Sequence, residues 1–405
     1  MKTISLHSIV LMIGPSGAGK STLANKLFNS HEIVSSDQIR EELTGDFRMQ
    51  TANSEVFFEL HRRVELKINM GQRAVVDATN LKVRDRKFFV DLARKNNVNL
   101  YYVVINRPID EKIRDGGWRL GVENLIEKHD EVFRSNLPDI NRGDGVATVV
   151  KHDESFHVVK RGNISEMINQ GNFDKLMVIG DVHGNFSDAS KLVRKADSEN
   201  AFTVYLGDVI DYGDNNLETF NMIYDRIMNG KALMVWGNHE RKLDMWIKAG
   251  FGQNGYRGKI GNGMKKTIEE IENLADKNLF KAKWRALEFM SGQHYVFGNM
   301  LFTHAAATPD LWNINSHRPH GEHGQMAFFG QVDRAKPLRE DGYPNRLYDW
   351  VNDVPENKTV IVGHDILSKN DPTTFKNQNG STVIFLDTGS SKGGKLSHIM
   401  YNIKE

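Results

Sequence analysis

From residue 175 onward, short apolar runs recur along the chain, and almost every one ends in Asp, Asn or His. The runs read KLMVIGD, FTVYLGD, KALMVWGN, QHYVFGNMLFTH, KTVIVGHD and TVIFLDTG. Apolar segments of this length, rich in β-branched and aromatic residues, are typical of buried strands. Because the carboxyl ends of neighbouring parallel strands meet at one edge of a sheet, we expect the polar residues to converge there.

The polar residues of these runs have the chemistry of metal ligands. The motifs GDVHG, GDVIDYG, GNHE, TH and GH follow one another between residues 180 and 364. The chain has no Cys, so disulfides and thiolate sites are excluded and any metal must be held by oxygen or imidazole ligands. Two ions that share a bridging carboxylate need such ligands. The candidates are Asp181 and His183 for one ion, Asp208 as the bridge, and Asn238, His304 and His364 for the other.

Residues 1–150 alternate between apolar runs and polar, periodic stretches. SIVLMIG, HEIVSSD, RAVVDATN and NLYYVVIN predict buried strands with helices between them, which is typical of an α/β domain with a parallel sheet. The segment NLPDINRGDGV, at 136–146, breaks this pattern. We therefore predict a first domain over 1–150, a linker over 151–174 and a second domain over 175–405, with a mostly helical insertion at 242–292.

The stretch GPSGAGKST fits the phosphate-loop pattern G-x-x-x-x-G-K-[ST]. Its glycines let backbone N–H groups face phosphate oxygens, and the helix that follows adds its positive end. Lys20 can neutralise the β- and γ-phosphates of ATP, and Ser21 or Thr22 can bind Mg²⁺. The candidate nucleotide-binding residues are Gly14, Pro15, Ser16, Gly17, Ala18, Gly19, Lys20, Ser21 and Thr22.

Asp37 follows Lys20 at the predicted end of the next strand, where its carboxylate can take the proton of an attacking hydroxyl. Arg40 comes one helical turn later. The same letters, SSDQIREEL, also fit the capped, acidic first turn of a helix, and the two interpretations are compatible. Further along, Arg114 and Arg119 fall on a predicted mobile lid that can close on the transferred phosphoryl group, although solvated helix charge explains them as well.

The N-terminal motifs GPSGAGKST, SSDQIR and VVDATN, with the Arg-containing lid, resemble the kinase module of the polynucleotide kinase-phosphatase family. That resemblance implies that Asp37 is the general base, that Arg40 contacts the acceptor phosphate, and that Lys20 and Ser21 hold ATP and Mg²⁺. The motifs from GDVHG to GH resemble the calcineurin-type metallophosphoesterase family over nearly all of 175–405. This second resemblance implies an α/β sandwich.

The second resemblance also implies that His239, oriented by Asp211, protonates the leaving oxygen or stabilises its charge. Two motifs depart from the family pattern. GDVIDYG has Tyr212 where many relatives have an Arg that clamps phosphate, and a phenol cannot supply a bidentate cation. Substitutes for that cation are Arg241, Arg334 and Arg346.

The other departure is GHDI, which lacks the second His of the G-H-x-H variant, so water completes the first ion's shell. Mn²⁺ suits such a mixture of carboxylate, imidazole and water. HRPHGEH, at 317–323, predicts a solvated loop near the metal site rather than a third metal site, because Pro319 and Gly321 argue against a helix.

A kinase module and a phosphatase in one chain predict an enzyme that heals nucleic-acid ends. It would phosphorylate 5′-hydroxyl ends of RNA or DNA and remove 3′-phosphates or 2′,3′-cyclic phosphates, and a separate ligase would act afterwards. Two alternatives stay open. Both activities could serve a small molecule, a dinucleoside polyphosphate or a phosphoprotein, or the chain could be a regulatory binder with an inactive phosphatase.

The composition is that of an ordinary protein without a strong global field, since the net charge is +1. No apolar run reaches the length of a membrane span, and the opening MKTISLHSIVLMIG predicts a buried strand rather than a signal peptide. We therefore expect a cytoplasmic protein without a membrane partner, from a phage or bacterium, that can form homo-oligomers.

Overall fold

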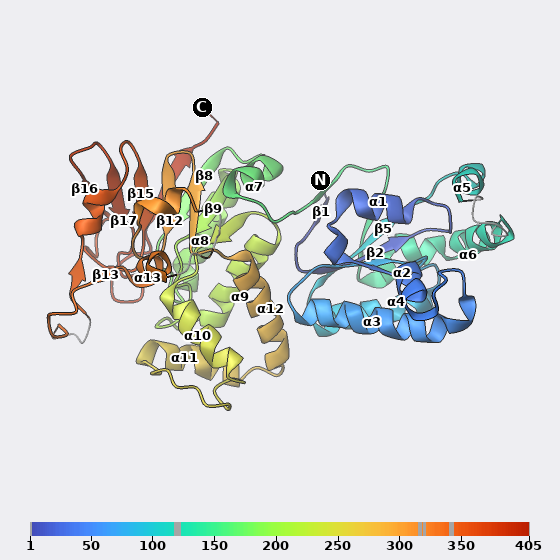
Figure 1. The fold of residues 1–405 in the computed structure, drawn as a ribbon, viewed down its shortest axis with the longest axis horizontal. Helices are drawn as coiled ribbons and strands as arrows, with labels where there is room; N and C mark the ends of the chain where they lie inside the picture. The colour runs from blue at the N-terminus through green and yellow to red at the C-terminus, as the bar shows by residue number, and fades with distance from the viewer. Residues whose placement is uncertain (1, 117–122, 315–317, 319–320, 340–343, 405) are drawn as a thin grey trace. The chain divides into compact units, whose positions relative to one another are not determined.

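The computed structural model describes residues 2–116, 123–314, 318, 321–339 and 344–404 (Figure 1). Its contacts divide the chain into two compact units. The first comprises residues 1–160 with 278–286, and the second comprises residues 161–277 with 287–405.

The first unit is built on a five-stranded parallel sheet with the strand order β3-β4-β2-β5-β6. A separate parallel pair joins β1 to β7. The bounds of these strands are β1 Lys2–Ile4, β2 Ser8–Ile13, β3 Ile33–Ser35, β4 Ala74–Asp77, β5 Asn99–Val104, β6 Thr148–Lys151 and β7 Phe156–Val158. The helices are α1 Lys20–Leu27, α2 Ser36–Thr44, α3 Asn53–Asn69, α4 Val83–Lys95, α5 Ile109–Gly116 and α6 Glu123–Asn141.

The central strand β2 is buried on both faces of this sheet. Ile9, Leu11 and Ile13 belong to one hydrophobic cluster, whereas Val10 and Met12 belong to another. A strand covered by helices on both sides must be apolar at every position, and this explains the uninterrupted run SIVLMI. The predicted α/β class with a parallel sheet is confirmed for this unit.

The second unit contains two larger sheets, with the strand orders β10-β9-β8-β18 and β11-β12-β15-β17-β16, and a small β13-β14 pair. The strands of the first sheet are β8 Lys175–Ile179, β9 Ala201–Tyr205, β10 Ala232–Met234 and β18 His398–Asn402. Those of the second are β11 His294–Phe297, β12 Met300–Thr303, β15 Thr359–Val362, β16 Thr373–Lys376 and β17 Thr382–Phe385, and the pair is β13 Gln331–Val332 with β14 Arg346–Leu347.

One hydrophobic cluster joins the two larger sheets, because it contains Val178 and Val204 from the first sheet and Phe302 and Ile361 from the second. Because the inner faces of both sheets are buried against each other, this unit is an α/β sandwich, as predicted. Its helices are α7 Ile164–Gly171, α8 Phe186–Ser198, α9 Asn216–Met228, α10 Asn238–Lys248, α11 Asn262–Glu272 and α13 Gly321–Phe329. Helix α12, Lys277–Met290, is divided, because its residues 278–286 belong to the first unit and its ends to the second. Helices α10 to α12 fill most of the predicted helical insertion.

Two predictions of local structure are wrong. The strand predicted to end at Asp37 ends at Ser35, and Ser35 caps helix α2 by accepting a hydrogen bond from the Gln38 backbone N–H. Asp37 therefore lies in the first turn of α2. The loop predicted at 317–323 includes residues outside the described ranges, but Gly321 to His323 begin helix α13, and His323 Nδ1 lies 2.8 Å from Thr308 Oγ1.

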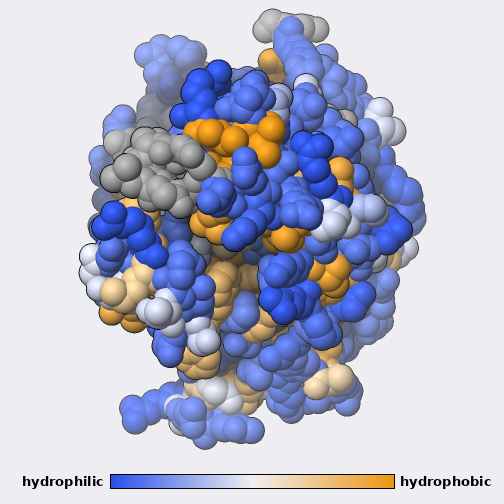
Figure 2. All heavy atoms as spheres, turned by 90° about the vertical axis from the view of Figure 1, so that its right-hand side faces the viewer, coloured by the Kyte–Doolittle hydropathy of each residue, from blue (hydrophilic) through white to orange (hydrophobic). Residues whose placement is uncertain are grey.

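The face of the molecule drawn in Figure 2 is mostly hydrophilic. Figure 2 shows one face on which hydrophobic side chains form small separate patches among hydrophilic ones. Among the described residues, no helix combines the length and the apolar character needed to cross a bilayer.

A buried ion pair stabilises the first unit. The Arg86 side chain is fully buried, and its Nε donates to Asp144 Oδ2 at 2.6 Å. Its Nη1 donates to the backbone oxygens of Asn80 and Leu81, and the Tyr102 hydroxyl donates to the same carboxylate of Asp144. Every polar group of this cluster is thus paired, so removing one partner leaves a buried charge without compensation.

We expect Arg86→Ala to lower the free energy of unfolding by about 3 kcal/mol, because Asp144 would remain buried without its cation. Chemical denaturation followed by circular dichroism measures the change. Arg84→Ala is the matched control, because the Arg84 side chain is 79% exposed and its removal should change the free energy by less than about 0.5 kcal/mol. A decrease in the free energy of unfolding of Arg86→Ala as small as that of the control would show that the buried ion pair does not stabilise the first unit.

Candidate functional site

A cavity of about 1120 Å³ opens beside the loop between β2 and α1 in the first unit. Gly17 and Gly19 of this loop have φ angles of 76° and 89°, which favour glycine. A Cβ on Gly17 would lie 2.4 Å from the Lys112 backbone oxygen. Of the predicted nucleotide-binding residues, 16–22 line the cavity, and Gly14 and Pro15 lie outside its lining. The Pro15 backbone oxygen accepts a hydrogen bond from Lys20 Nζ.

Asp37 and Arg40 line the same cavity from helix α2. Arg40 donates to Asp37 Oδ1 at 2.7 Å, and also to the Phe47 backbone oxygen and Asn53 Oδ1. The Arg40 side chain is only 5% exposed, whereas that of Asp37 is 46% exposed. The carboxylate is therefore open to a ligand, and the guanidinium holds it in position.

The lining of this cavity is rich in cations. Among the described residues it contains eight basic side chains and four acidic ones. The basic residues are Lys20, Lys26, Arg40, Arg48, Lys82, Arg84, Arg107 and Lys128, and the acidic ones are Asp37, Asp77, Asp85 and Asp115. An excess of positive charge in a concave site favours polyanionic ligands.

Of the two predicted lid arginines, Arg114 falls within the described residues, and it does not line the cavity. Arg114 is 69% exposed, pairs with Asp115 and is absent from the described lining. Arg119 lies outside the described residues. Arg107, which the sequence reasoning missed, lines the cavity, and its Nη1 lies 3.5 Å from where a Cβ on Gly19 would be. It follows β5 closely, so the strand-end rule could have found it.

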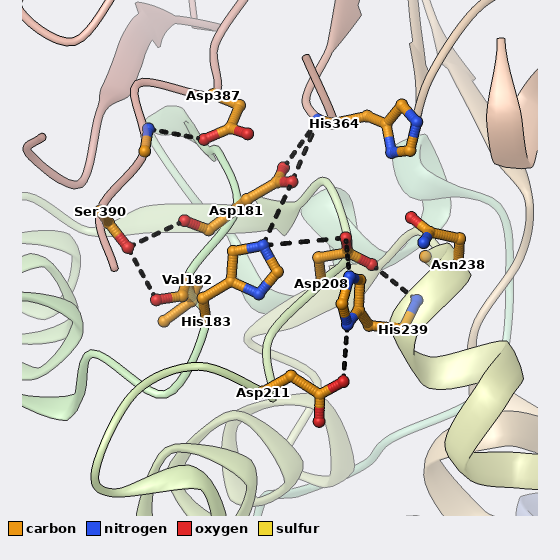
Figure 3. A network of polar contacts seen from close by, with 12 residues as sticks. Asp181, Val182, His183, Asp208, Asp211, Asn238, His239, His364, Asp387 and Ser390 are labelled. Atoms are coloured by element: carbon orange, nitrogen blue, oxygen red, sulfur yellow. Dashed lines mark hydrogen bonds and ion pairs between the residues drawn. The ribbon is translucent and has the colours of Figure 1, made fainter. Parts of the chain in front are cut away.

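In the second unit, the strand-end side chains meet at one edge of the sandwich (Figure 3). They follow five strands, and within each sheet these five strands run parallel to one another. They are Asp181 and His183 after β8, Asp208 after β9, Asn238 after β10, His304 after β12 and His364 after β15. The six residues predicted as metal ligands are therefore brought together.

The spacing of the ligand atoms fits cations between them. His183 Nε2 lies 4.0 Å from Asp181 Oδ2 and 3.9 Å from Asp208 Oδ2. His304 Nε2 lies 3.4 Å from the same Asp208 oxygen. The two longer separations exceed a hydrogen bond, and all three suit pairs of ligands that each lie about 2 Å from a shared ion. Asp208 is common to both groups, as a bridging carboxylate would be.

Backbone oxygens orient two of these imidazoles. His183 Nδ1 lies 2.9 Å from the Ile210 oxygen, and His304 Nδ1 lies 2.8 Å from the Leu206 oxygen. A proton on each Nδ1 leaves Nε2 with a lone pair that faces the site, which is how metal-binding histidines are commonly held. His364 Nδ1 and Asn238 Oδ1 lie 3.1 Å and 2.9 Å from His304 Nε2, which completes the second group.

The electrostatics of the site also call for cations. Burial, with the charges of Asp387 and Asp208, holds the pKa of Asp181 well above its ordinary value. Burial raises the pKa of Asp387 to about 6 and that of Glu240 to about 7. Burial also lowers the pKa of His183 to about 4, so this imidazole is neutral. Buried carboxylates and neutral imidazoles are the donor set of a divalent cation, and they fit the predicted ions.

Sequence reasoning missed Glu240 and Asp387. Glu240 is buried and accepts hydrogen bonds from the backbone N–H groups of Asp208, Val209 and Gly237, so it shapes the loop that carries the bridging carboxylate. Asp387 follows β17 and accepts from the Gly389 N–H. Because Asp387 closes an apolar run, the strand-end rule that found the six ligands also points to it.

His239 and Asp211 form a pair beside the ligands. His239 Nδ1 lies 2.6 Å from Asp211 Oδ2, and the other Asp211 oxygen accepts from the Thr267 hydroxyl. His239 Nε2 lies 3.8 Å from Asp208 Oδ2, so the ring faces the metal site. Burial opposes the charged form of His239, but the charges of Asp208 and Asp211 outweigh it and raise its pKa. The geometry lets His239 hold a proton and present it to a bound ligand.

The candidate phosphate-binding cations lie in different surroundings. Arg334 is exposed on a turn. The Arg241 guanidinium lies 5.5 Å from the centre of the Phe329 ring. Arg346 Nη2 lies 2.6 Å from His364 Nε2, so Arg346 contacts a predicted ligand.

Comparison with known families identifies both units. Residues 9–114 match the AAA domain family, and residues 174–385 match the calcineurin-like phosphoesterase family. Among curated proteins, a bis(5′-nucleosyl)-tetraphosphatase PrpE (asymmetrical) from Geobacillus sp. (strain WCH70) is 24% identical over 241 residues, which cover 56% of this chain and 90% of the relative. A probable serine/threonine-protein phosphatase from Encephalitozoon cuniculi is 20% identical over 127 residues, or 29% of this chain and 28% of the relative.

Solved structures show weaker similarity. A putative diadenosine tetraphosphatase has a TM-score of 0.38 and 16% identity, covering 56% of this chain and 89% of its own. A chain from the Pnkp1/Rnl/Hen1 RNA repair complex has a TM-score of 0.31 and 14% identity, covering 62% of this chain and 87% of its own.

Two glycines let the ligand loops approach each other. A Cβ on Gly363 would lie 2.0 Å from Asp181 Oδ1, and a Cβ on Gly237 would lie 2.2 Å from Asp208 Oδ1. We therefore expect Gly363→Ala to displace Asp181 and to lower manganese affinity about tenfold or more, as losses at such supporting positions do. Isothermal titration calorimetry with Mn²⁺ measures the affinity.

Gly261→Ala is the matched control for this prediction, because a Cβ there would meet nothing within 4 Å. Both variants should keep the circular dichroism spectrum of the wild type. Unchanged manganese affinity in a folded Gly363→Ala protein would show that Asp181 does not need this close approach.

Proposed function

Because this chain belongs to the calcineurin-like phosphoesterase family and carries an AAA domain ahead of that region, we propose that it heals both ends of a broken nucleic acid. The first unit would transfer the γ-phosphate of ATP to a 5′-hydroxyl end. The second would hydrolyse a 3′-phosphate or a 2′,3′-cyclic phosphate. The products, a 5′-phosphate and a 3′-hydroxyl, are the ends that a separate ligase joins.

The cationic cavity of the first unit supports the kinase half of the proposal. Residues 16–22 would hold the phosphates of ATP, with Lys20 against the β- and γ-phosphates. Mg²⁺, bound through Ser21, would neutralise charge that develops on the transferred group. Asp37, open to the cavity and oriented by Arg40, would accept the proton of the attacking hydroxyl.

The buried strand-end residues of the second unit support the phosphatase half. Asp181, His183 and Asp208 would hold one Mn²⁺ ion, and Asp208, Asn238, His304 and His364 the other. The ions would polarise the phosphate and activate water at neutral pH. His239, held by Asp211, would give its proton to the leaving oxygen as the ester bond breaks.

One observation carries the choice of substrate. The positively charged lining of the cavity extends beyond residues 16–22 of the phosphate loop, because Arg48, Lys82 and Arg84 also line it. These side chains favour an acceptor that is itself a polyanion, such as a nucleic-acid end, over an uncharged alcohol.

Hydrolysis of a dinucleoside polyphosphate is the second candidate for the metal site. The observation that favours it is the similarity of the second unit to bis(5′-nucleosyl)-tetraphosphatases, which extends over 90% of the length of one such relative. This candidate keeps the metal chemistry and changes the leaving group from a nucleic-acid hydroxyl to a nucleotide.

An RNA oligonucleotide with 5′-hydroxyl and 3′-phosphate ends tests the proposal. With ATP, Mg²⁺ and Mn²⁺ present, mass spectrometry should detect one phosphate gained at the 5′ end and one lost at the 3′ end. We expect Asp37→Ala to slow only the gain, and Asp181→Ala only the loss, each about 100-fold or more, since each removes a central group of one site. Asp91→Ala, at an exposed position on α4, is the control and should keep both activities.

Diadenosine tetraphosphate, assayed in parallel, separates the two candidates. An unchanged oligonucleotide together with rapid cleavage of diadenosine tetraphosphate would favour the second candidate. A doubly processed oligonucleotide with slow cleavage of the dinucleotide would favour end healing.

A further inference from the structure

The second unit has an aromatic ring where its family resemblance predicts a phosphate-binding arginine. Tyr212 has a φ of 66°, and its ring lies 5.0 Å from the His183 ring and 5.4 Å from the His239 ring, centre to centre. The His183 and His239 rings also lie 5.0 Å from each other, so the Tyr212 ring forms a wall beside both the predicted metal ligand and the predicted proton donor. A phenol in that wall provides no positive charge for a phosphate oxygen.

A lysine from a distant part of the chain brings positive charge to the same wall. Lys392 Nζ lies 4.8 Å from the centre of the Tyr212 ring, a distance typical of a cation–π contact. The ammonium thus lies against a ring that itself packs beside His183 and His239.

The backbone around Lys392 is tied to the loop that carries the metal ligands. Lys392 N–H donates to the Gly389 oxygen at 2.8 Å, which closes a tight turn after β17. Within this turn the Ser390 hydroxyl donates to the Val182 and Asp181 backbone oxygens, at 2.8 Å and 3.2 Å. Figure 3 shows Ser390 reaching that loop. The turn therefore fixes the origin of the Lys392 side chain relative to Asp181.

We propose that Lys392, seated over Tyr212, is the cation that binds a non-bridging oxygen of the substrate phosphate in place of the missing arginine. This inference rests on the proposed phosphatase activity and deepens it. A lysine ammonium is a compact point charge that makes single contacts, whereas a guanidinium forms two parallel hydrogen bonds. Lys392 would therefore contribute chiefly to the affinity for phosphate, and the metal ligands would set the orientation of the bound phosphate.

The other candidate cations are less suited to this position. Arg346 lies against His364, a member of the other predicted ligand group, and against Asp365. Arg241 lies over the Phe328 and Phe329 rings. Lys392 Nζ, by contrast, lies 4.8 Å from the centre of the ring that replaces the arginine.

The experiment compares Lys392→Met, Lys392→Arg and Lys395→Met. Methionine keeps much of the side-chain length without the charge, arginine restores a cation, and Lys395 is an exposed lysine of the same segment. Calorimetric titration of the manganese-loaded proteins with inorganic phosphate gives a Kd without any turnover. Hydrolysis of p-nitrophenyl phosphate gives KM and kcat, and elemental analysis gives the manganese content.

We expect Lys392→Met to raise the Kd for phosphate, and the KM, about tenfold or more, which is the effect of losing one charged hydrogen bond. Its manganese content and kcat should change much less. The Kd for phosphate and the KM of Lys392→Arg should stay within about threefold of the wild-type values. Those of Lys395→Met should equal the wild-type values.

Two results would overturn the role of Lys392. One is a phosphate Kd in Lys392→Met equal to that of Lys395→Met. The other is a loss of manganese from Lys392→Met that accounts for its weaker phosphate binding, because the side chain would then act through the metal site. Failure of the proposed activity is distinguishable, since the wild type would then hydrolyse no phosphoester while the phosphate titration still measures the contribution of Lys392.

Discussion

The second unit depends on carboxylates buried together at one edge of its sandwich. Asp181, Asp208, Glu240 and Asp387 are all shielded from water, and their mutual repulsion with burial raises the pKa of three of them. Like charges so close together are tolerated only where positive charge or hydrogen bonds offset them. Backbone N–H groups satisfy Glu240, and the histidines around Asp208 offset its charge. Asp181 and Asp387 accept hydrogen bonds from the backbone N–H groups of His364 and Gly389, and bound divalent cations would offset their charge further.

The backbone of this site also adopts unfavourable conformations. His183, Asp208, Asp211 and His364 all adopt positive φ angles, which are uncommon for residues other than glycine. Such conformations persist where surrounding structure holds them, and they cluster at functional sites. Here the parallel strands of the two sheets provide the rigid support, and each strained residue lies in a loop just beyond a strand.

In both units the site residues follow the ends of apolar strands, and this explains how much of the protein the sequence could predict. The apolar strands, the phosphate loop and the convergence of the six candidate ligand residues were all predictable, because each depends on local pattern and on where a strand ends. The strand-end rule could have pointed to Arg107, but the sequence could not show that Arg114 does not belong to the described lining of the cavity, or that Lys392 lies over Tyr212. Those contacts join residues from different strands and helices, and the direction of a long side chain depends on packing that sequence spacing does not determine.

The helix that begins at Ser36 illustrates the same limit on a smaller scale. The run HEIVSSD has the composition of a strand, but the Ser35 side chain caps a helix and ends β3 before Asp37. Capping and strand propensity compete over a few residues, and tertiary contacts decide between them. Asp37 still reaches the cavity, because the first turn of α2 follows the strand end directly.

Diffraction from manganese-soaked crystals at the manganese absorption edge tests the central claim most directly. The account predicts two anomalous peaks, both within ligand distance of Asp208, with Asp181 and His183 on one and Asn238, His304 and His364 on the other. A single peak that excludes either group of ligands, or no peak in crystals that contain manganese elsewhere, would contradict a two-metal site at these strand ends.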